Sequence, residues 1–458
     1  MTKIYTKDYS GVLFLDGLSH DVAIKRYQER RHQLLSREKT VVVVSGMDQP
    51  LEETMPWLLA DTPLYQDPLF LYLTGLNQCA VKIILNPFSD TIKTHLFITP
   101  KNAKKEFWTG TQIGYDKNNI DALKKLTGFD QVHPISAFTS QLRTIIQEYK
   151  VSSISMPWSE PQKKQKQIKD NHFRFKKIME KQCHSMENVV IQNLSHMTED
   201  RLTLDPIDLQ HIFVANDIVT EAFMSVCHQL PNLKRETEVA GIIKGEMAKR
   251  SWLGQSFPAI VACGKNARVL HYWKNNDSLS KNELLLMDFG CRYHSVVSDV
   301  SRTIPVSGTF NPLQKILYQI VLDAQTYVET QIKEGVTIAK LNDLCWDRLE
   351  KELEQHFLSK GGKMSRPYKK VPHNVGHFLA HAVHDGDYYR NYRMVPLKVG
   401  QVITNEPGLY GYFELEIDGD LYKETCGIRI EDNLVVTKMG CKNLTTCPKT
   451  IKEIEEIV

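Results

Sequence analysis

The sequence predicts two domains, an α/β domain followed by a larger α+β domain. The chain has 458 residues, of which 42% are hydrophobic, and this is more than one ordinary core accommodates. In the first part, apolar runs of strand length alternate with helical patterns, as in an α/β unit. The stretch 161–206 is polar and rich in Lys and Gln, so we place the boundary within it and assign the domains to residues 1–185 and 186–458.

The first domain is expected to open with a helix that leads into a strand. Residues 21–39 are charged with spaced apolar side chains, and the β-branched run 40–45 (TVVVVS) is typical of a buried strand. Further strands are predicted at 70–73, 81–85 and 94–98, and further helices near Asp121 and Ile135.

Two long helices are predicted at the start of the second domain, where they should cover a sheet. Apolar residues recur at helical spacing in 206–227 and 236–250. The strands of that sheet are expected in five short apolar runs: 259–263, 284–287, 296–305, 402–405 and 434–437.

Composition narrows the class of protein. The net charge of +3 arises from 57 basic and 54 acidic residues, so both signs share the surface and nucleic acid is not an expected partner. The apolar patch at 11–15 is too short for a signal-peptide core or a membrane span, so no membrane partner is expected. Nine cysteines without a C-x-x-C pair indicate a reducing compartment, and we expect a cytoplasmic protein.

The first informative motif is LLLMDFGCRYHSVVSDVSRT, in which Asp288 ends an apolar run and Asp299 follows 11 residues later. A hairpin that turns near Tyr293 would bring the two carboxylates together. They would then repel each other unless a cation lay between them. The alternative is a surface hairpin with two solvated acids.

The second motif is HNVGHFLAHAVHD, which contains His373, His377, His381 and His384. On a helix the last three would share a face, and an H-x-x-x-H pair can bind zinc. The metalloprotease signature H-E-x-x-H is absent. The alternative is a set of ordinary hydrogen-bonded histidines.

The segments VITNEPGLY and CGIRIEDNLVVT each place one acid, Glu406 or Glu431, within an apolar strand pattern. Burial of an unpaired carboxylate costs several kcal/mol, so each needs a metal, an arginine or a set of donors. Arg429 lies two residues from Glu431 and would point to the same strand face, which makes a salt bridge the alternative for that acid.

Together, these motifs supply four carboxylates and one imidazole with a formal charge of about −4, which two divalent cations would neutralise. Such oxygen-rich sites with one histidine suit manganese, iron, cobalt or zinc, and a pair of these ions makes hydroxide available near neutral pH. The set is suited to hydrolysis of an amide. Its members are Asp288, Asp299, His377, Glu406 and Glu431.

These segments resemble the pita-bread metallopeptidases, specifically the aminopeptidase P and prolidase branch. The order Asp, Asp, His, Glu, Glu matches, as do the words MDFGCRYHSVVSDVSRTIPVSG, VGHFL, ITNEPGLY and GIRIEDNLVVT. PAIVACGKNARVLHY also matches and aligns His271 with an active-site histidine of the family, and LYQDPLFLYLTGLN matches in the first domain. The resemblance covers nearly the whole chain and is weakest over 101–195.

The resemblance implies a fold and a metal centre. The fold would be an α/β N-terminal domain followed by a C-terminal α+β pita-bread (creatinase/aminopeptidase) catalytic domain. The five side chains named above would bind two divalent metal ions, usually manganese, with cobalt, iron or zinc as alternatives. Asp299 and Glu431 would bridge both ions.

The resemblance also implies roles in catalysis and substrate binding. Glu406 would move a proton, while His271 and His384 would stabilise the reacting peptide by hydrogen bonds. His373 and Arg429 match further residues that line or support the site of the family.

The expected activity is that of an Xaa-Pro aminopeptidase acting on peptides with proline at the second position. The large N-terminal domain disfavours a methionine aminopeptidase, and the 25-residue spacing between Glu406 and Glu431 is closer to aminopeptidase P than to eukaryotic prolidases. A homodimer or a larger homo-oligomer is also implied. The alternatives are a prolidase and a catalytically silent module that binds peptides or proteins.

One stretch departs from the family pattern. Ala380, His381 and Ala382 stand where the family usually has Gly, a variable residue and Asp. Alanine neither takes positive φ cheaply nor accepts hydrogen bonds through its side chain, so the loop that carries His384 is expected to hold its conformation differently and to affect substrate preference.

Overall fold

The computed structural model describes residues 17–47, 66–109, 111–158, 171–184, 189–194, 196–386 and 392–458. Their contacts divide the chain into two compact units, one up to Arg201 and one from Leu202 onward. Each unit is described by itself. The apolar patch at 11–15 and the domain boundary predicted between residues 185 and 186 lie outside the described residues.

The first unit is built on a mixed six-stranded sheet with the order β4-β3-β2-β1-β5-β6. The central strand β1 (Val41–Ser45) runs antiparallel to β2 (Lys82–Leu85) and parallel to β5 (Ser153–Met156). The other strands are β3 (Thr94–Ile98), β4 (Gln131–Pro134) and β6 (Val190–Asn193).

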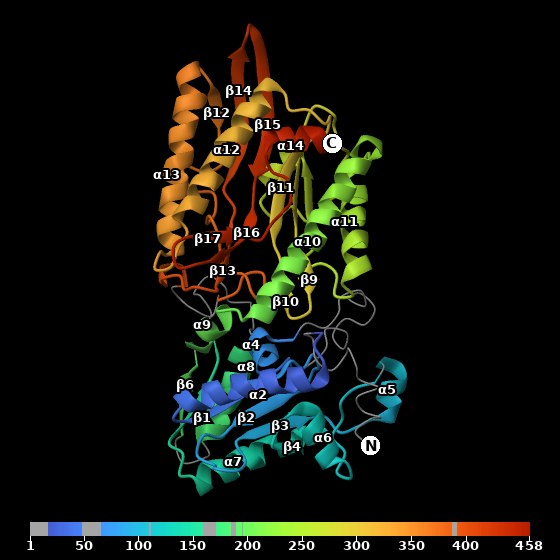
Figure 1. Cartoon of the computed structure of the whole chain (residues 1–458), viewed down its shortest axis with the longest axis vertical. Helices are drawn as coiled ribbons and strands as arrows, with labels where there is room; N and C mark the ends of the chain where they lie inside the picture. Colours follow the sequence, from blue (N-terminus) through green and yellow to red (C-terminus); the bar gives the residue numbers. More distant parts are fainter. Residues whose placement is uncertain are drawn as a thin grey trace. The chain divides into compact units, whose positions relative to one another are not determined.

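Helices cover both faces of this sheet (Figure 1). Val42 and Val44 of β1 belong to one hydrophobic core, and Val41 and Val43 belong to the other, because successive strand residues point to opposite faces. The first core includes residues of α2 (His20–Arg37), α4 (Pro68–Thr74) and α6 (Ile120–Thr127), and the second includes residues of α7 (Phe138–Glu148) and α8 (Asn171–His184). The unit also contains α5 (Ala103–Thr109) and α9 (His196–Leu202).

The strand predicted at 70–73 is wrong, since these residues lie in α4. The Asp67 carboxylate accepts hydrogen bonds from the backbone N–H groups of Leu69 (3.0 Å) and Phe70 (2.9 Å), and Pro68 occupies the first turn. Gly75 ends the helix with φ of 67°. These start and stop signals outweigh the strand-like apolar composition between them.

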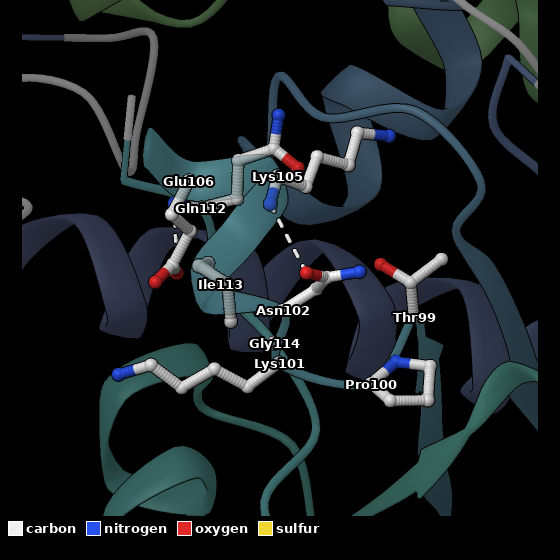
Figure 2. A pocket seen from close by; sticks show the side chains of 9 residues that line it. All are labelled: Thr99, Pro100, Lys101, Asn102, Lys105, Glu106, Gln112, Ile113 and Gly114. Carbon is white, nitrogen blue, oxygen red and sulfur yellow. Dashed lines mark hydrogen bonds between the residues drawn. The ribbon is translucent and has the colours of Figure 1, made fainter. Parts of the chain in front are cut away.

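A cavity of about 300 Å³ lies beside α5 in the first unit. Figure 2 shows that Asn102 and Glu106 face backbone groups of the same segment. Asn102 Oδ1 accepts a hydrogen bond from Lys105 N (3.0 Å), and Glu106 Oε1 accepts one from Gln112 N (3.4 Å). Both bonds lie within the segment around α5 and stabilise its conformation, so they do not indicate a bound ligand.

In the second unit, two pairs of helices pack against the strands. The predicted helices are present as α10 (Pro206–Gln229) and α11 (Glu236–Arg250), which pack on each other. A second pair, α12 (Pro312–Gln331) and α13 (Ile338–His356), was not predicted, and α12 packs on β14 and β15. A short helix, α14 (Ile451–Ile457), lies near the end of the chain. None of the helices in the described ranges combines the length and the apolar character that a bilayer span requires.

The strands of the second unit form small antiparallel sheets. In the first, β8 (Leu284–Phe289) lies between β7 (Ile260–Cys263) and β11 (Val300–Pro305). In the second, β16 (Asp432–Val436) lies between β13 (Val402–Asn405) and β17 (Cys441–Asn443). The third contains β12 (Lys363–Ser365), β14 (Gly408–Ile417) and β15 (Asp420–Arg429).

Two hairpins shape the second unit. The predicted turn near Tyr293 is confirmed, because β9 (Arg292–Tyr293) pairs with β10 (Val296–Val297) across His294. The single strand predicted at 296–305 is instead divided into β10 and β11, with Asp299 in the gap. The long β14–β15 hairpin was not predicted. Its turn consists of Asp418 and Gly419, which both have positive φ (55° and 88°), as a two-residue Asp-Gly turn requires.

We predict that Asp67→Ala lowers the free energy of unfolding by about 1 kcal/mol, because α4 loses its N-terminal cap. Ser19→Ala is the matched control, since Ser19 stands at the N-cap of α2 without a side-chain cap bond. Denaturant unfolding of the full chain measures both. An equal effect of the two variants would contradict the role assigned to Asp67.

Candidate metal centre

Four acidic side chains converge where strands of two sheets end. Asp288 lies in β8 and Asp299 precedes β11, while Glu406 follows β13 and Glu431 lies between β15 and β16. Backbone bonds tie these segments together, because Glu431 N donates to the Ser301 carbonyl (3.0 Å). The predicted carboxylates therefore meet in space although they are far apart in the sequence.

His377 lies at the centre of this group. One ligand atom each from Asp299, His377 and Glu431 lie within 4.8 Å of one another. His377 Nε2 is 3.4 Å from Asp299 Oδ2 and 3.6 Å from Glu406 Oε1. Its Nδ1–H donates to the carbonyl of Phe378 (3.1 Å), which leaves the lone pair of Nε2 for the carboxylate side, as in many metal-binding histidines.

The four carboxylates lie so close together that they repel one another when all are ionised without a cation. The pKa of Asp299 is raised well above its ordinary value by burial and then by the charge of Asp288 and Glu406. Burial and the charges of Asp299 and Asp288 likewise raise the pKa of Glu431. Burial, and next the charge of Glu431, raise the pKa of Glu406. The carboxylates can therefore be ionised together favourably only when a cation lies between them.

Two buried oxygens show what kind of group fits. Asp288 Oδ1 and Asp299 Oδ1 are inaccessible to solvent and accept no hydrogen bond from any described residue. A buried oxygen without a donor is costly, whereas a divalent cation is a suitable partner for a carboxylate. The donor set thus fits metal ions.

Arg429 supports the cluster from one side. The salt bridge considered for Glu431 is not the one observed, because Arg429 Nη2 pairs with Asp288 Oδ2 at 2.7 Å. Arg429 Nε donates to Ser301 Oγ (2.8 Å), and that hydroxyl donates to Glu431 Oε2 (2.9 Å). A single guanidinium leaves most of the negative charge of the four acids uncompensated.

His373 is held as a neutral imidazole. Its Nδ1–H donates to the carbonyl of Asn374 (2.8 Å), so Nε2 accepts from the Tyr410 hydroxyl (2.8 Å). Tyr410 in turn accepts a bond from Arg429 Nη1 (3.1 Å). Burial and the charge of Arg429 lower the pKa of His373 to about 3. The chain of bonds therefore links Arg429 to His373 beside Glu406, whose Oε2 is 3.7 Å from His373 Nδ1.

The two remaining predicted histidines lie beside the cluster. The ring of His384 contacts the ring of His377, with centroids 4.4 Å apart. The pKa of His384 is lowered to about 4 by the charge of His377, by burial and by His271. His271 is exposed and packs edge-on against Trp273. His384 therefore contacts the proposed ligand His377, and His271 lies close enough to His384 and His373 to lower the pKa of both.

The helical arrangement considered for His377, His381 and His384 is not the one observed. The segment 373–386 contains no helix and instead pairs with the edge of β13, where Thr404 N donates to the His377 carbonyl (2.9 Å). Gly376 permits this approach, because a Cβ there would lie 2.1 Å from the Thr404 carbonyl oxygen. His377 and His384 meet, whereas His381 bonds to Ser295.

Sequence reasoning missed two supporting residues, Ser301 and Tyr410. Ser301 contacts both Glu431 and Arg429, and Tyr410 contacts both His373 and Arg429. Ser301 lies two residues after Asp299, so the period-two alternation of a strand was a usable signal. Tyr410 had no such signal because the β14–β15 hairpin was not predicted.

The site and its fold define a class, the metal-dependent hydrolases with an acidic centre. Residues 210–438 match the model of metallopeptidase family M24, and residues 27–154 match the N-terminal domain of aminopeptidase P. The first match spans half of the chain. The chain therefore belongs to metallopeptidase family M24, and it is a metallo-exopeptidase that uses divalent metal ions.

The chain is also similar to individual proteins over most of its length. Xaa-Pro aminopeptidase 3 of Mus musculus is 29% identical over 451 residues, which cover 94% of this chain and 85% of that protein. The mitochondrial intermediate cleaving peptidase 55 of Arabidopsis thaliana is 28% identical, with 95% and 83% covered. A structure of a candidate aminopeptidase P from Bacillus anthracis superposes with a TM-score of 0.78 at 25% identity, with 94% and 97% covered. The predicted fold, an α/β domain followed by an α+β pita-bread domain, is confirmed.

We predict that manganese raises the melting temperature of chelator-treated protein more at pH 7.5 than at pH 5.5. The pKa values of Asp299, Glu406 and Glu431 are raised in the folded state. Their contribution to stability is therefore present below the ordinary carboxyl range near pH 4 and is lost as pH rises through the raised values. Bound cations balance the charge of the ionised carboxylates, so the metal-loaded protein does not lose this stability as the pH rises.

The control for this prediction is the double variant Asp299→Asn/Glu431→Gln, whose metal-free stability should depend less on pH between 4 and 7.5. Differential scanning calorimetry measures both proteins. A melting temperature that manganese shifts equally at the two pH values, or not at all, would contradict the electrostatic account.

Proposed function

We propose that the chain is a manganese-dependent Xaa-Pro aminopeptidase, which hydrolyses the bond between an N-terminal residue and a following proline. The observation that carries the proposal is the cluster of Asp299, His377 and Glu431, with Glu406 and Asp288 beside it, in a chain that matches family M24 and the aminopeptidase P N-terminal domain. The curated relatives that cover 94–95% of the chain support it, since one is named for this activity.

The proposed metal site holds two ions. Its ligands are Asp288, Asp299, His377, Glu406 and Glu431. Asp299 and Glu431 would hold the ions together with His377, since one ligand atom from each of the three lies within 4.8 Å of the others and both carboxylates are buried (5% and 2% exposed). Four carboxylates and a single imidazole favour manganese, and cobalt, iron and zinc are alternative occupants.

Bound divalent ions of this kind supply a water that is activated for attack on a carbonyl near neutral pH. Glu406 is proposed to take up a proton and return it to the leaving amine. Without a cation, burial and the charge of Glu431 raise the pKa of Glu406 well above its ordinary value. Thr404 Oγ1, 3.5 Å from Glu406 Oε1, helps to orient it.

The histidines and Arg429 are proposed to bind the peptide. With a pKa lowered to about 4, His384 is neutral near pH 7 and keeps one N–H to donate to a carbonyl or a developing oxyanion. His271, which is exposed, is proposed to donate in the same way. His373 and Arg429, joined through Tyr410, are proposed to orient the substrate.

We further propose a homodimer or a larger homo-oligomer. Two adjacent aromatic side chains of α5, Phe107 and Trp108, are 83% and 75% exposed. An exposed aromatic pair of this kind favours contact with a second copy. A cytoplasmic location is proposed as well, supported by cysteines that remain thiols in the described residues, such as Cys183, Cys227 and Cys345.

The proposed activity is tested with an Xaa-Pro-Xaa tripeptide, an Xaa-Pro dipeptide and an Xaa-Ala-Xaa tripeptide as control. We expect release of the first residue from the proline tripeptide alone, with manganese, and its loss after chelation. Cleavage restricted to the dipeptide would identify a prolidase. Absence of cleavage together with absence of bound metal would identify a silent binding module.

We predict that Asp299→Asn lowers both manganese content and turnover by about 100-fold or more, because loss of even an outer partner of a metal site costs 10- to 100-fold. Cys291→Ala is the control, since Cys291 is buried nearby but its thiol contacts no acid of the cluster. Turnover by metal-free Asp299→Asn protein would refute a metal-dependent mechanism.

A further inference from the structure

His381 is fully buried in the second unit but lies outside the set of proposed ligands. Its Nδ1 lies 2.9 Å from the Ser295 carbonyl oxygen, in the turn between β9 and β10. Because a carbonyl only accepts, Nδ1 carries the proton. Nε2 lies 3.9 Å from Oδ2 of Asp208, a buried acid in the first turn of α10. The Ser295 bond ties the His381 side chain to the β9–β10 turn, whereas the 3.9 Å separation from Asp208 is too long for a hydrogen bond.

The backbone around His381 is fixed as well. The Ala380 carbonyl accepts a hydrogen bond from Val297 N (3.0 Å), which adds the loop to β10. Asp385 Oδ2 accepts from the N–H groups of His381 (3.0 Å) and Ala382 (3.2 Å). The loop from Ala380 to Asp385 is therefore closed by its own carboxylate and anchored through the His381 side chain.

His384 lies within this closed loop, and its ring contacts His377. No backbone strain arises from the two alanines, because neither Ala380 nor Ala382 has positive φ. Ala380 is fully buried, so its small side chain suits the tight packing next to His381. In this chain the loop is therefore held without a glycine at 380 or an acid at 382, through Asp385 and the His381 side chain.

We propose that His381 is a positioning residue for His384: its hydrogen bond to the Ser295 carbonyl sets where the His384 ring stands relative to His377. The proposal rests on the proposed function in one respect, the role of His384 in turnover. A displacement of about 1 Å in such a group costs up to about 100-fold in rate.

The test is a double-mutant cycle with His381→Leu and His384→Ala. We expect His381→Leu to lower kcat by about 10- to 100-fold with manganese content unchanged. In the His384→Ala background, the same substitution should change kcat less than about twofold, because interacting residues are not additive. Equal losses in both backgrounds, or a loss of manganese, would overturn the proposal.

Two further variants separate positioning from general destabilisation. His381→Asn keeps an N–H donor near Nδ1 and should retain kcat within about tenfold of wild type, the range of one hydrogen bond. A loss as large as that of His381→Leu would count against the Ser295 anchor. His95→Leu removes a buried histidine (4% exposed) of the first unit and should lower stability without lowering kcat.

A spectroscopic measurement keeps this test independent of the proposed activity. The protein is labelled with ¹⁵N-histidine and loaded with zinc in place of manganese. His381→Leu should then shift the ring resonances of His384, which are assigned with the variant His384→Ala. A shift without any turnover by wild-type protein would sustain the positioning role while refuting the peptidase activity. Unmoved His384 resonances would overturn the positioning role, whatever the turnover.

Discussion

The mutual repulsion of four clustered carboxylates, of which Asp299 and Glu431 are buried, is the constraint on which the second unit depends. Asp288, Asp299, Glu406 and Glu431 arrive from different strand ends, and burial together with neighbouring charge raises the pKa of the last three. A fold held together only by apolar packing would relieve this repulsion by separating the strands. The sheets resist it because all six residues of β8 pair with β11 and all four residues of β13 pair with β16. Cations would convert the same arrangement from a cost into a source of stability.

A second charged network behind the site is balanced and shows the contrast. Arg302 and Asp432 are fully buried and form an ion pair at 2.7 Å, and Lys449 also contacts Asp432. Arg302 Nη1 donates to the carbonyl of Glu431 (2.6 Å), so this network holds the backbone of a proposed ligand. The charges of Arg302 and Lys449 outweigh burial and lower the pKa of Asp432. Asp432 thus lies beside two cationic side chains, whereas the neighbouring Glu431 lies beside three acids. Only the arrangement around Glu431 needs a metal ion to balance its charge.

The sequence predicted the acids of the site better than the backbone that carries its histidines. An acid in an apolar strand is a strong signal, because burial without a partner is costly, and Glu406 and Glu431 both stood out on that ground. The histidine spacing did not indicate the backbone, because H-x-x-x-H is compatible with a helix, whereas Gly376 allows the segment to lie against β13. The strand prediction at 70–73 is wrong because the N-terminal cap that Asp67 provides favours a helix there. Pairing between distant strands, such as Glu431 with Ser301, could not be read from local patterns at all.

The central claim is that the acidic cluster exists to bind cations, and equilibrium dialysis against manganese at pH 7.5 tests it most directly. The account predicts two ions per chain, both lost when the site acids are neutralised by substitution. A wild-type protein that folds normally and binds no divalent ion at millimolar concentration would contradict it.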